Sequence, residues 1–271
     1  MSPNGQRTLQ QVERADRPLV GYAEYLQPGF FKGFHSHPRA QVMHPLSGVM
    51  RVVIDTATFV VMPSTALFVP ARVDHSIEVE GPVEMRTLFL THGVSGRIGE
   101  TARVITVSPL LQQLIIAASS EPLDWELSGR GHHIAELALD EIGSAADLKL
   151  MIRLPKSPLA QDAARLVLDE AEGTHSIEDL AERLHVSSRT LTRLFQKETG
   201  LSLAQWRQQV RLTRALEALV RGATPKEAAH LGGYKSVSAF GVALRTGFGL
   251  TPGAARKLYE NSGDQFVSDL G

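Results

Sequence analysis

The chain contains no cysteine, so disulfide frameworks and thiolate zinc sites are excluded, and a reducing compartment is compatible with its chemistry. No stretch reaches 18 uncharged apolar residues, and residues 1–18 lack the apolar core of a signal peptide. We therefore expect a cytoplasmic protein with no membrane partner. Charged side chains make up 21% of the 271 residues and apolar ones 43%. This composition is typical of a folded globular protein, and the chain is long enough for two domains.

The net charge of −1 argues against a uniformly basic nucleic-acid-binding protein, but the two halves of the chain differ. Residues 1–155 contain 13 Lys and Arg against 16 Asp and Glu, whereas residues 156–260 contain 15 against 11. An acidic first half and a basic second half indicate two domains with different partners. Two prolines in 153–158 mark the boundary. We predict domains at 1–155 and 156–260, followed by a flexible tail at 261–271.

The first hundred residues contain seven short apolar stretches separated by turn residues. Their close and even spacing predicts an antiparallel β-sandwich or barrel. The predicted strands are 19–26, 41–46, 50–54, 58–62, 66–70, 75–79 and 83–90. Two helices follow, one over 109–119 with Ser108 as its cap, and one over 132–142. Both are apolar enough to pack on the β-domain or on a second copy of it.

The basic half contains one helical plan twice. Residues 180–202 and 228–252 each contain a short helix, a tight turn and a longer amphipathic helix that ends at a glycine. The residues that match at an offset of 49 are Leu191 with Phe240, Phe195 with Leu244, and Gly200 with Gly249. Such a unit is a helix-turn-helix, whose second helix enters the DNA major groove. The helix predicted between the units, 203–221, would span about 28 Å, close to the roughly 34 Å between successive major-groove openings.

The second helix of each unit has one apolar stripe and one polar face. Arginine and glutamine on such a face can form paired hydrogen bonds with guanine and adenine edges, although most such faces are simply solvated. The predicted DNA-binding residues are Arg189, Thr192, Arg193, Gln196, Lys197, Ser238 and Arg245. Phosphate contacts are expected from Arg207, Arg211, Arg214 or Lys235. The second unit is the weaker one, because Val242 stands on its outward face.

Residues 176–256 resemble the DNA-binding domain of AraC/XylS-type transcription regulators. The resemblance rests on SIEDLAERLHVSSRTLTRLFQKETGLS, on RLTRALEAL and on the closing pattern GGY…S.SAF…L…FGLTP. It implies that the first unit makes most base contacts, with Arg189 and Arg193 as the best candidates. It further implies double-stranded operator DNA, a second copy of the chain and RNA polymerase as partners, and an N-terminal domain that dimerises or senses a ligand.

The stretch GFHSHPRAQVMHP contains three histidines and a glutamine in 13 residues. Together with PSTALFVPARVDHSIEV it resembles the two metal motifs of the cupin superfamily, with Gln41 in place of the usual glutamate. Alternation in a strand would place His35 and His37 on one face, and a barrel would bring His75 alongside them. Three imidazoles and an amide oxygen would suit a divalent transition metal such as Zn, Fe, Ni or Mn, which is the only candidate cofactor.

Two other interpretations of this cluster stay open, a metal-free pocket for a small organic effector and an inert barrel core. The sequence predicts a two-domain α+β protein, an antiparallel cupin-like β-barrel followed by an all-α domain with two helix-turn-helix units. We predict a sequence-specific DNA-binding transcription regulator controlled by a small molecule or metal at the barrel, and not an enzyme. The alternative is a cupin metalloenzyme, a dioxygenase or isomerase with a helical assembly domain, which leaves the duplication unexplained.

Overall fold

The computed structural model describes residues 7–55, 57–148, 150–169 and 176–256. The tail predicted at 261–271 lies outside these residues. Every helix in the described ranges is too short or too polar to cross a bilayer.

The described residues form two compact units, one from 7–52 and 61–148 and the other from 53–60 and 150–256. The main division falls just before strand β11 (Met151–Arg153), a few residues earlier than the domain boundary expected from the prolines.

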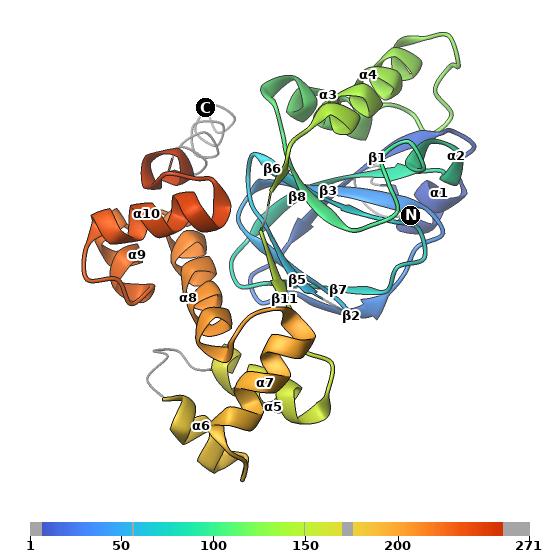
Figure 1. The fold of residues 1–271 in the computed structure, drawn as a ribbon. Helices are drawn as coiled ribbons and strands as arrows, with labels where there is room; N and C mark the ends of the chain where they lie inside the picture. The colour runs from blue at the N-terminus through green and yellow to red at the C-terminus, as the bar shows by residue number, and fades with distance from the viewer. Residues whose placement is uncertain (1–6, 56, 149, 170–175, 257–271) are drawn as a thin grey trace. The chain divides into compact units, whose positions relative to one another are not determined.

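Antiparallel strands arranged in two sheets dominate the first half of the chain (Figure 1). The first sheet has the order β1 (Leu19–Leu26), β8 (Val83–Leu90), β3 (Ala40–Ser47), β6 (Thr65–Val69), β9 (Arg103–Thr106), β10 (Asp147–Leu148). The second has the order β11, β5 (Ala57–Val61), β4 (Met50–Ile54), β7 (His75–Val79), β2 (Phe31–His35). All seven predicted strands are present to within one residue at each end. Strand β2 was not predicted, because its sequence FKGFH is partly exposed along its length and gives no apolar run.

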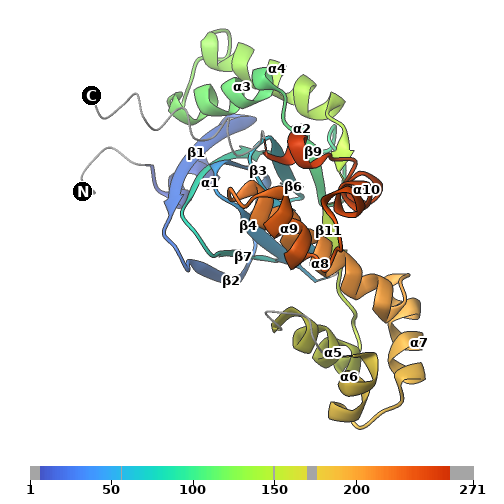
Figure 2. The ribbon, with the colours of Figure 1, turned by 90° about the vertical axis from the view of Figure 1, so that its left-hand side faces the viewer.

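Two helices cover one face of the first sheet, α3 (Pro109–Ser120) and α4 (Arg130–Ser144), and they lie side by side in both views (Figures 1 and 2). Both confirm the predicted helices, and the Ser108 hydroxyl accepts the backbone N–H of Leu111 at 3.0 Å, as a cap should. Helix α3 approaches β1 closely at Gly21, where a Cβ would lie 2.4 Å from the Ala118 backbone. A side chain at position 21 would therefore force the helix off the sheet.

A short helix that the sequence did not predict, α1 (Leu9–Arg14), packs beside β1 and β8. Its one fully buried side chain, Val12, contacts a small cluster with Val20 and Phe89. A further short helix, α2 (His92–Ser95), follows β8.

The described part of the second unit contains six helices after β11. They are α5 (Pro158–Asp169), α6 (Ile177–Arg183), α7 (Ser188–Thr199), α8 (Leu203–Val220), α9 (Pro225–Leu231) and α10 (Val237–Phe248). Ser176 and Thr224 each begin a helix with a complete capping box, in which the cap side chain accepts a backbone N–H and the acidic side chain three residues later accepts the N–H of the cap residue. Within this unit α8 lies between the group α5–α7 and the pair α9–α10 (Figures 1 and 2).

Candidate DNA-binding face and metal centre

The two helix-turn-helix units, α6–α7 and α9–α10, have the same turn. The N–H of Val186 donates to Ala181 O at 2.9 Å, and in the second unit the N–H of Tyr234 donates to Ala229 O at 2.8 Å. Each turn needs one residue in the left-handed region, which is Gly233 (φ 72°) in the second unit and His185 (φ 55°) in the first. The duplication read from the sequence is therefore a duplication of backbone geometry.

The buried faces of the recognition helices α7 and α10 also correspond. Leu191 and Phe195 of α7 are fully buried, as are Phe240 and Leu244 of α10. Both helices end at a left-handed glycine, with φ of 79° in α7 and 71° in α10. Since the apolar stripe of each helix is buried, its opposite face is open.

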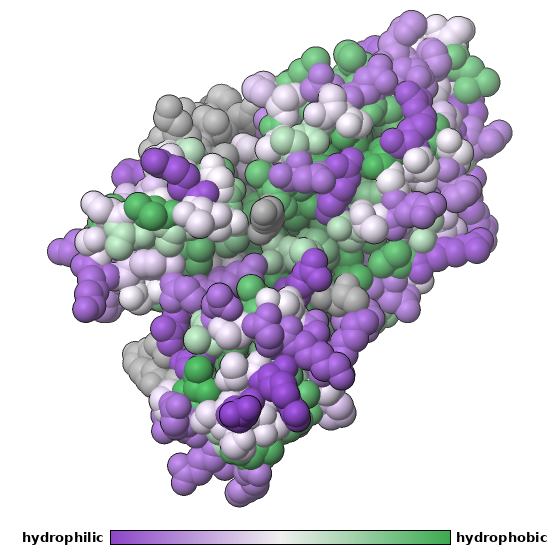
Figure 3. All heavy atoms as spheres, in the orientation of Figure 1, coloured by the Kyte–Doolittle hydropathy of each residue, from purple (hydrophilic) through white to green (hydrophobic). Residues whose placement is uncertain are grey.

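The predicted reading face of α7 is solvent-accessible, and Figure 3 shows hydrophilic side chains gathered over this helix. Arg189, Arg193 and Lys197 are exposed, and Thr192 is half-buried. Gln196 is exposed too, but its side-chain amide nitrogen donates to Gly200 O at 3.0 Å. This bond gives a partner to a backbone carbonyl at the C-terminal end of the helix. Two arginines and a lysine are thus available to a polyanion from one helix face.

The equivalent face of α10 is poorer in charge. Ser238 and Arg245 are exposed, but between them Val242 is 66% exposed and offers no hydrogen bond. A methyl-bearing side chain can contact a thymine methyl group but cannot bind a phosphate. The outward face of α10 therefore has fewer charged groups than that of α7, as the sequence indicates.

The phosphate contact expected from Arg207 is wrong, because that side chain is buried on α8, with 8% exposure. Arg207 lies on the buried side of α8, together with Leu203, Trp206 and Val210. Lys235, in the turn between α9 and α10, is exposed.

The three histidines of the barrel meet as predicted, although by a different route. His35 ends β2 and pairs directly across from His75 on β7. His37 lies two residues beyond the end of β2, so strand alternation does not place it, and this part of the prediction is wrong. The ring centroids are 4.4 Å apart for His35 and His75, 4.9 Å for His35 and His37, and 5.5 Å for His37 and His75.

Each of the three imidazoles is fixed through its Nδ1 atom. His35 Nδ1 lies 2.8 Å from Gly33 O, and His75 Nδ1 lies 2.9 Å from Val73 O. His37 Nδ1 lies 2.5 Å from Glu13 Oε1. Since a carbonyl or carboxylate oxygen can only accept, each Nδ1 donates and the lone pair of a neutral ring is left on Nε2.

The three rings bring their ligand nitrogens close together. One ligand nitrogen from each of the three rings lies within 4.8 Å of the others. His35 Nε2, His75 Nε2 and Gln41 Oε1 are buried and have no hydrogen-bond partner among the described residues. Buried polar atoms without partners are rare in folded proteins, and a common reason is an ion or water that belongs there. This donor set fits a divalent transition metal.

Burial favours the neutral form of two of the three imidazoles, which is the form that a metal requires. The pKa of His75 is lowered to about 4, mainly by burial and to a smaller extent by the nearby His35 and His37. Burial is also the main cause that lowers the pKa of His35. Neutral imidazole is the ligand form, so these shifts favour binding at neutral pH.

The cluster opens into a barrel cavity of about 130 Å³. Residues that line it include Leu9, Tyr22, Glu24, Leu26, Phe30, Lys32, His35, His37, Gln41, Met43, Ile77, Met85, Thr87 and Phe89. Pockets for drug-sized ligands usually measure about 300–1,000 Å³, so this cavity suits an ion with a few waters or a very small molecule. All four predicted pocket residues belong to the same site, since His75 joins it through the ring cluster.

Glu13 was not among the predicted site residues. It lies on α1, more than 20 residues before the histidine cluster, in a segment that contributes one buried side chain. The sequence does contain a signal for the helix that carries Glu13. Thr8 and Gln11 have the spacing of a capping box, which is typical of a helix that begins at Leu9.

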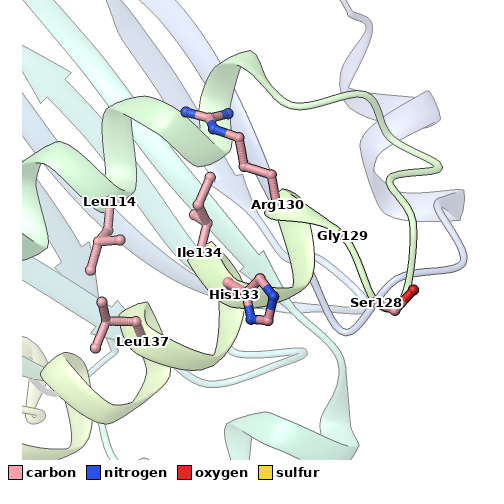
Figure 4. A pocket seen from close by; sticks show the side chains of 7 residues that line it. All are labelled: Leu114, Ser128, Gly129, Arg130, His133, Ile134 and Leu137. Atoms are coloured by element: carbon pink, nitrogen blue, oxygen red, sulfur yellow. The ribbon is translucent and has the colours of Figure 1, made fainter.

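A second, open pocket of about 480 Å³ lies on the first unit, where α3 and α4 meet. In Figure 4 Leu114 of α3 faces Ile134 and Leu137 of α4, with Arg130 and His133 at the side. Leu110 and Leu137 are 48% and 43% exposed, so this helix pair presents apolar surface.

Comparison with known proteins agrees with both halves of this description. A helix-turn-helix domain family matches residues 180–258, and a cupin domain family matches residues 23–91. The HTH-type transcriptional regulator NimR from Escherichia coli is 29% identical over 219 residues, which cover 81% of this chain and 80% of that protein. The HTH-type transcriptional activator RhaR from Pectobacterium atrosepticum is 30% identical over 114 residues, 40% of each chain.

Among solved structures, an AraC-type transcriptional regulator from Chromobacterium violaceum is 27% identical, with a TM-score of 0.36, and covers 38% of this chain and 92% of its own. ToxT from Vibrio cholerae is 10% identical, with a TM-score of 0.37, and the match covers 91% of this chain and 99% of ToxT.

A cupin-like barrel followed by two helix-turn-helix units with an open basic face defines a DNA-binding transcription regulator. The matched domains and relatives do not support the metalloenzyme alternative. In both of its domains and in their order, the chain is similar to AraC-type transcription regulators.

Proposed function

We infer that this regulator is controlled by a divalent transition metal held in the barrel by His35, His37 and His75, with Gln41 as a fourth ligand. The observation that carries this is the set of Nδ1 hydrogen bonds. They turn the three Nε2 atoms toward one another, and two of these atoms are buried without a partner among the described residues. A bound ion would supply a charge and a cross-link between β2, β7 and the segment that follows β2.

An organic effector is the weaker candidate for the same pocket. The cavity of about 130 Å³ is small for one, and a metal-free pocket would leave the converging lone pairs unsatisfied. We also assign the barrel a sensing role and no catalytic role. The reason is that the same chain contains helix-turn-helix units, whose DNA binding a ligand in the barrel would control.

On DNA, we assign base reading to α7 through Arg189 and Arg193, with Thr192, Gln196 and Lys197 beside them. The second unit would hold the adjacent groove through Ser238 and Arg245. The support is the exposed basic face of α7 and an α8 of 18 residues, about 27 Å long, between the units.

Two further partners complete the proposal. The apolar surface of α3 and α4 supports a homodimer, which sedimentation of the wild type and a Leu137→Glu variant would test. RNA polymerase is a partner expected of a regulator bound near a promoter, and DNA binding supports a cytoplasmic location.

The deciding experiment combines elemental analysis of the purified protein with gel shifts on DNA upstream of its own coding sequence, with and without Zn, Ni, Fe or Mn. We expect the wild type and His133→Ala, a control at an exposed histidine, to bind about one ion per chain and to change DNA affinity when it is added. His75→Ala should lose both effects. A wild-type protein that binds DNA but takes up none of the four metals would refute metal control.

A further inference from the structure

Helix α1 is held against the barrel by contacts that fix the place of Glu13. Val12 is fully buried against Val20 and Phe89, and the capping box of Thr8 and Gln11 sets the start of the helix. The Glu13 carboxylate is 24% exposed, and the His37 side chain that it contacts is 5% exposed. The contact is therefore a mostly buried one between two positioned groups.

A buried arginine adds a second restraint. Arg39, with 6% exposure, donates to Glu13 O at 3.2 Å, to Arg17 O at 3.0 Å and to Phe89 O at 3.4 Å, and it also donates to Ala15 O. One guanidinium thus ties the end of α1 and the segment after it to strand β8. Movement of the Glu13 backbone would break its hydrogen bond with Arg39 and disturb the other bonds of this guanidinium.

The contact between Glu13 and His37 affects the charge of the candidate metal centre. Three neutral imidazoles and one amide supply no negative charge to a dication, since Gln41 stands where the cupin motif usually has a carboxylate. A carboxylate that accepts the Nδ1 proton of a ligand histidine orients the ring and makes its Nε2 a better donor. His35 and His75 have main-chain carbonyls at this position, so His37 alone of the three has an anion.

We propose that Glu13 is a positioning residue of the metal centre, which fixes His37 for coordination and supplies from α1 the negative charge that the amide of Gln41 does not. This rests on the proposed metal function. It makes the N-terminal helix a part of the sensor, although it contributes no ligand itself.

Metal affinity of the full-length protein tests this role. Binding of Co²⁺ would be followed by its visible absorption, which reports ligand geometry, and Zn²⁺ affinity by competition with a chelator. Glu13→Gln keeps an oxygen acceptor but loses the charge, and Glu13→Ala loses both. We expect affinity to fall about tenfold in the first and toward about 100-fold in the second, with an altered Co²⁺ spectrum in the second.

Two matched controls separate positioning from general effects. Gln10→Ala changes an exposed residue of the same helix and should leave affinity unchanged. Glu24→Gln removes a carboxylate that lines the cavity but makes none of the three Nδ1 bonds, and its effect should be clearly smaller. Gln41→Glu should restore most of the affinity lost in Glu13→Gln, because it places a negative charge next to the ion.

The outcomes are distinct. A wild-type protein that binds neither metal would overturn the proposed function and this role together. A wild type that binds metal while both Glu13 variants match it would overturn only the role of Glu13, as would an equal loss in Glu24→Gln. Thermal unfolding with chelator present identifies a variant that no longer folds, and Glu13→Gln, which preserves size and shape, keeps the test available if Glu13→Ala fails.

Discussion

Acid should destabilise the first unit through His44, a histidine that has no part in the proposed metal centre. Its side chain is fully buried in β3, where Nδ1 donates to Thr65 O at 2.8 Å. The pKa of His44 is lowered to about 4, mainly by burial and to a smaller extent by the nearby Arg86. In the unfolded chain the same group has a pKa of about 6.5. Between these two values the unfolded state binds a proton that the folded state excludes, so the free energy of unfolding decreases as the pH falls from 6.5 toward 4.

One pKa unit corresponds to about 1.4 kcal/mol, so acidification from pH 7 to pH 5 should remove about 2 kcal/mol through His44. The matched variant is His44→Gln, whose amide can donate to Thr65 O but does not titrate. Its loss between the two pH values should be smaller than that of the wild type by this amount. His35 and His75 also titrate, but they do so in both proteins and cancel in the comparison.

The chain offers a direct assay, because one of its two tryptophans lies in each unit. In a Trp206→Phe background, Trp125 fluorescence follows denaturant unfolding of the first unit alone, with a chelator present to exclude metal. Equal losses of stability in the wild type and His44→Gln would refute the reasoning, because they would mean that His44 accepts a proton without unfolding.

Other changes test the second unit. Replacing Arg189 or Arg193 by Ala should weaken operator binding by about 1–3 kcal/mol if the side chain reads a base, and unchanged affinity and footprint in both would contradict the assigned face. His185→Gly should raise the thermal stability of this unit by up to about 1 kcal/mol, because a side chain is strained at φ 55° whereas Gly233 is not; a decrease would argue that the His185 side chain stabilises the turn. Val242→Arg should tighten DNA binding and steepen the dependence of log affinity on log salt by about 0.9, and an unchanged slope would show that this face does not reach a phosphate.

Much of the fold was predictable because periodicity and capping are local properties. The apolar strands, the helix cap at Ser108 and the matching helix pairs all follow from residues close together in sequence, and the structure contains them at the predicted places. What failed depended on contacts between distant segments. Strand β2 is defined by its pairing with β7, and Arg207 is buried because other helices pack around α8. Glu13 reaches His37 from a helix that one buried valine holds in place.

The histidine cluster shows the same limit at one site. The residue types and the resemblance to cupin motifs were enough to name four residues, of which the three histidines meet and Gln41 lines the same cavity. Strand alternation placed His37 wrongly, because β2 ends at His35 and the backbone turns away from regular pairing there. Which imidazole nitrogen would face a metal ion depends on acceptors such as Gly33 O and Val73 O, and these are visible only in three dimensions.

The inequality of the two recognition helices gives a bound monomer a direction. A protein that reads bases with α7 and only grips the neighbouring groove with α10 cannot be turned end for end on its operator without losing affinity. Each binding site would then consist of one strictly defined block and one loosely defined block, roughly a helical turn apart. Their order along the DNA would fix which end of the protein points toward the start of transcription.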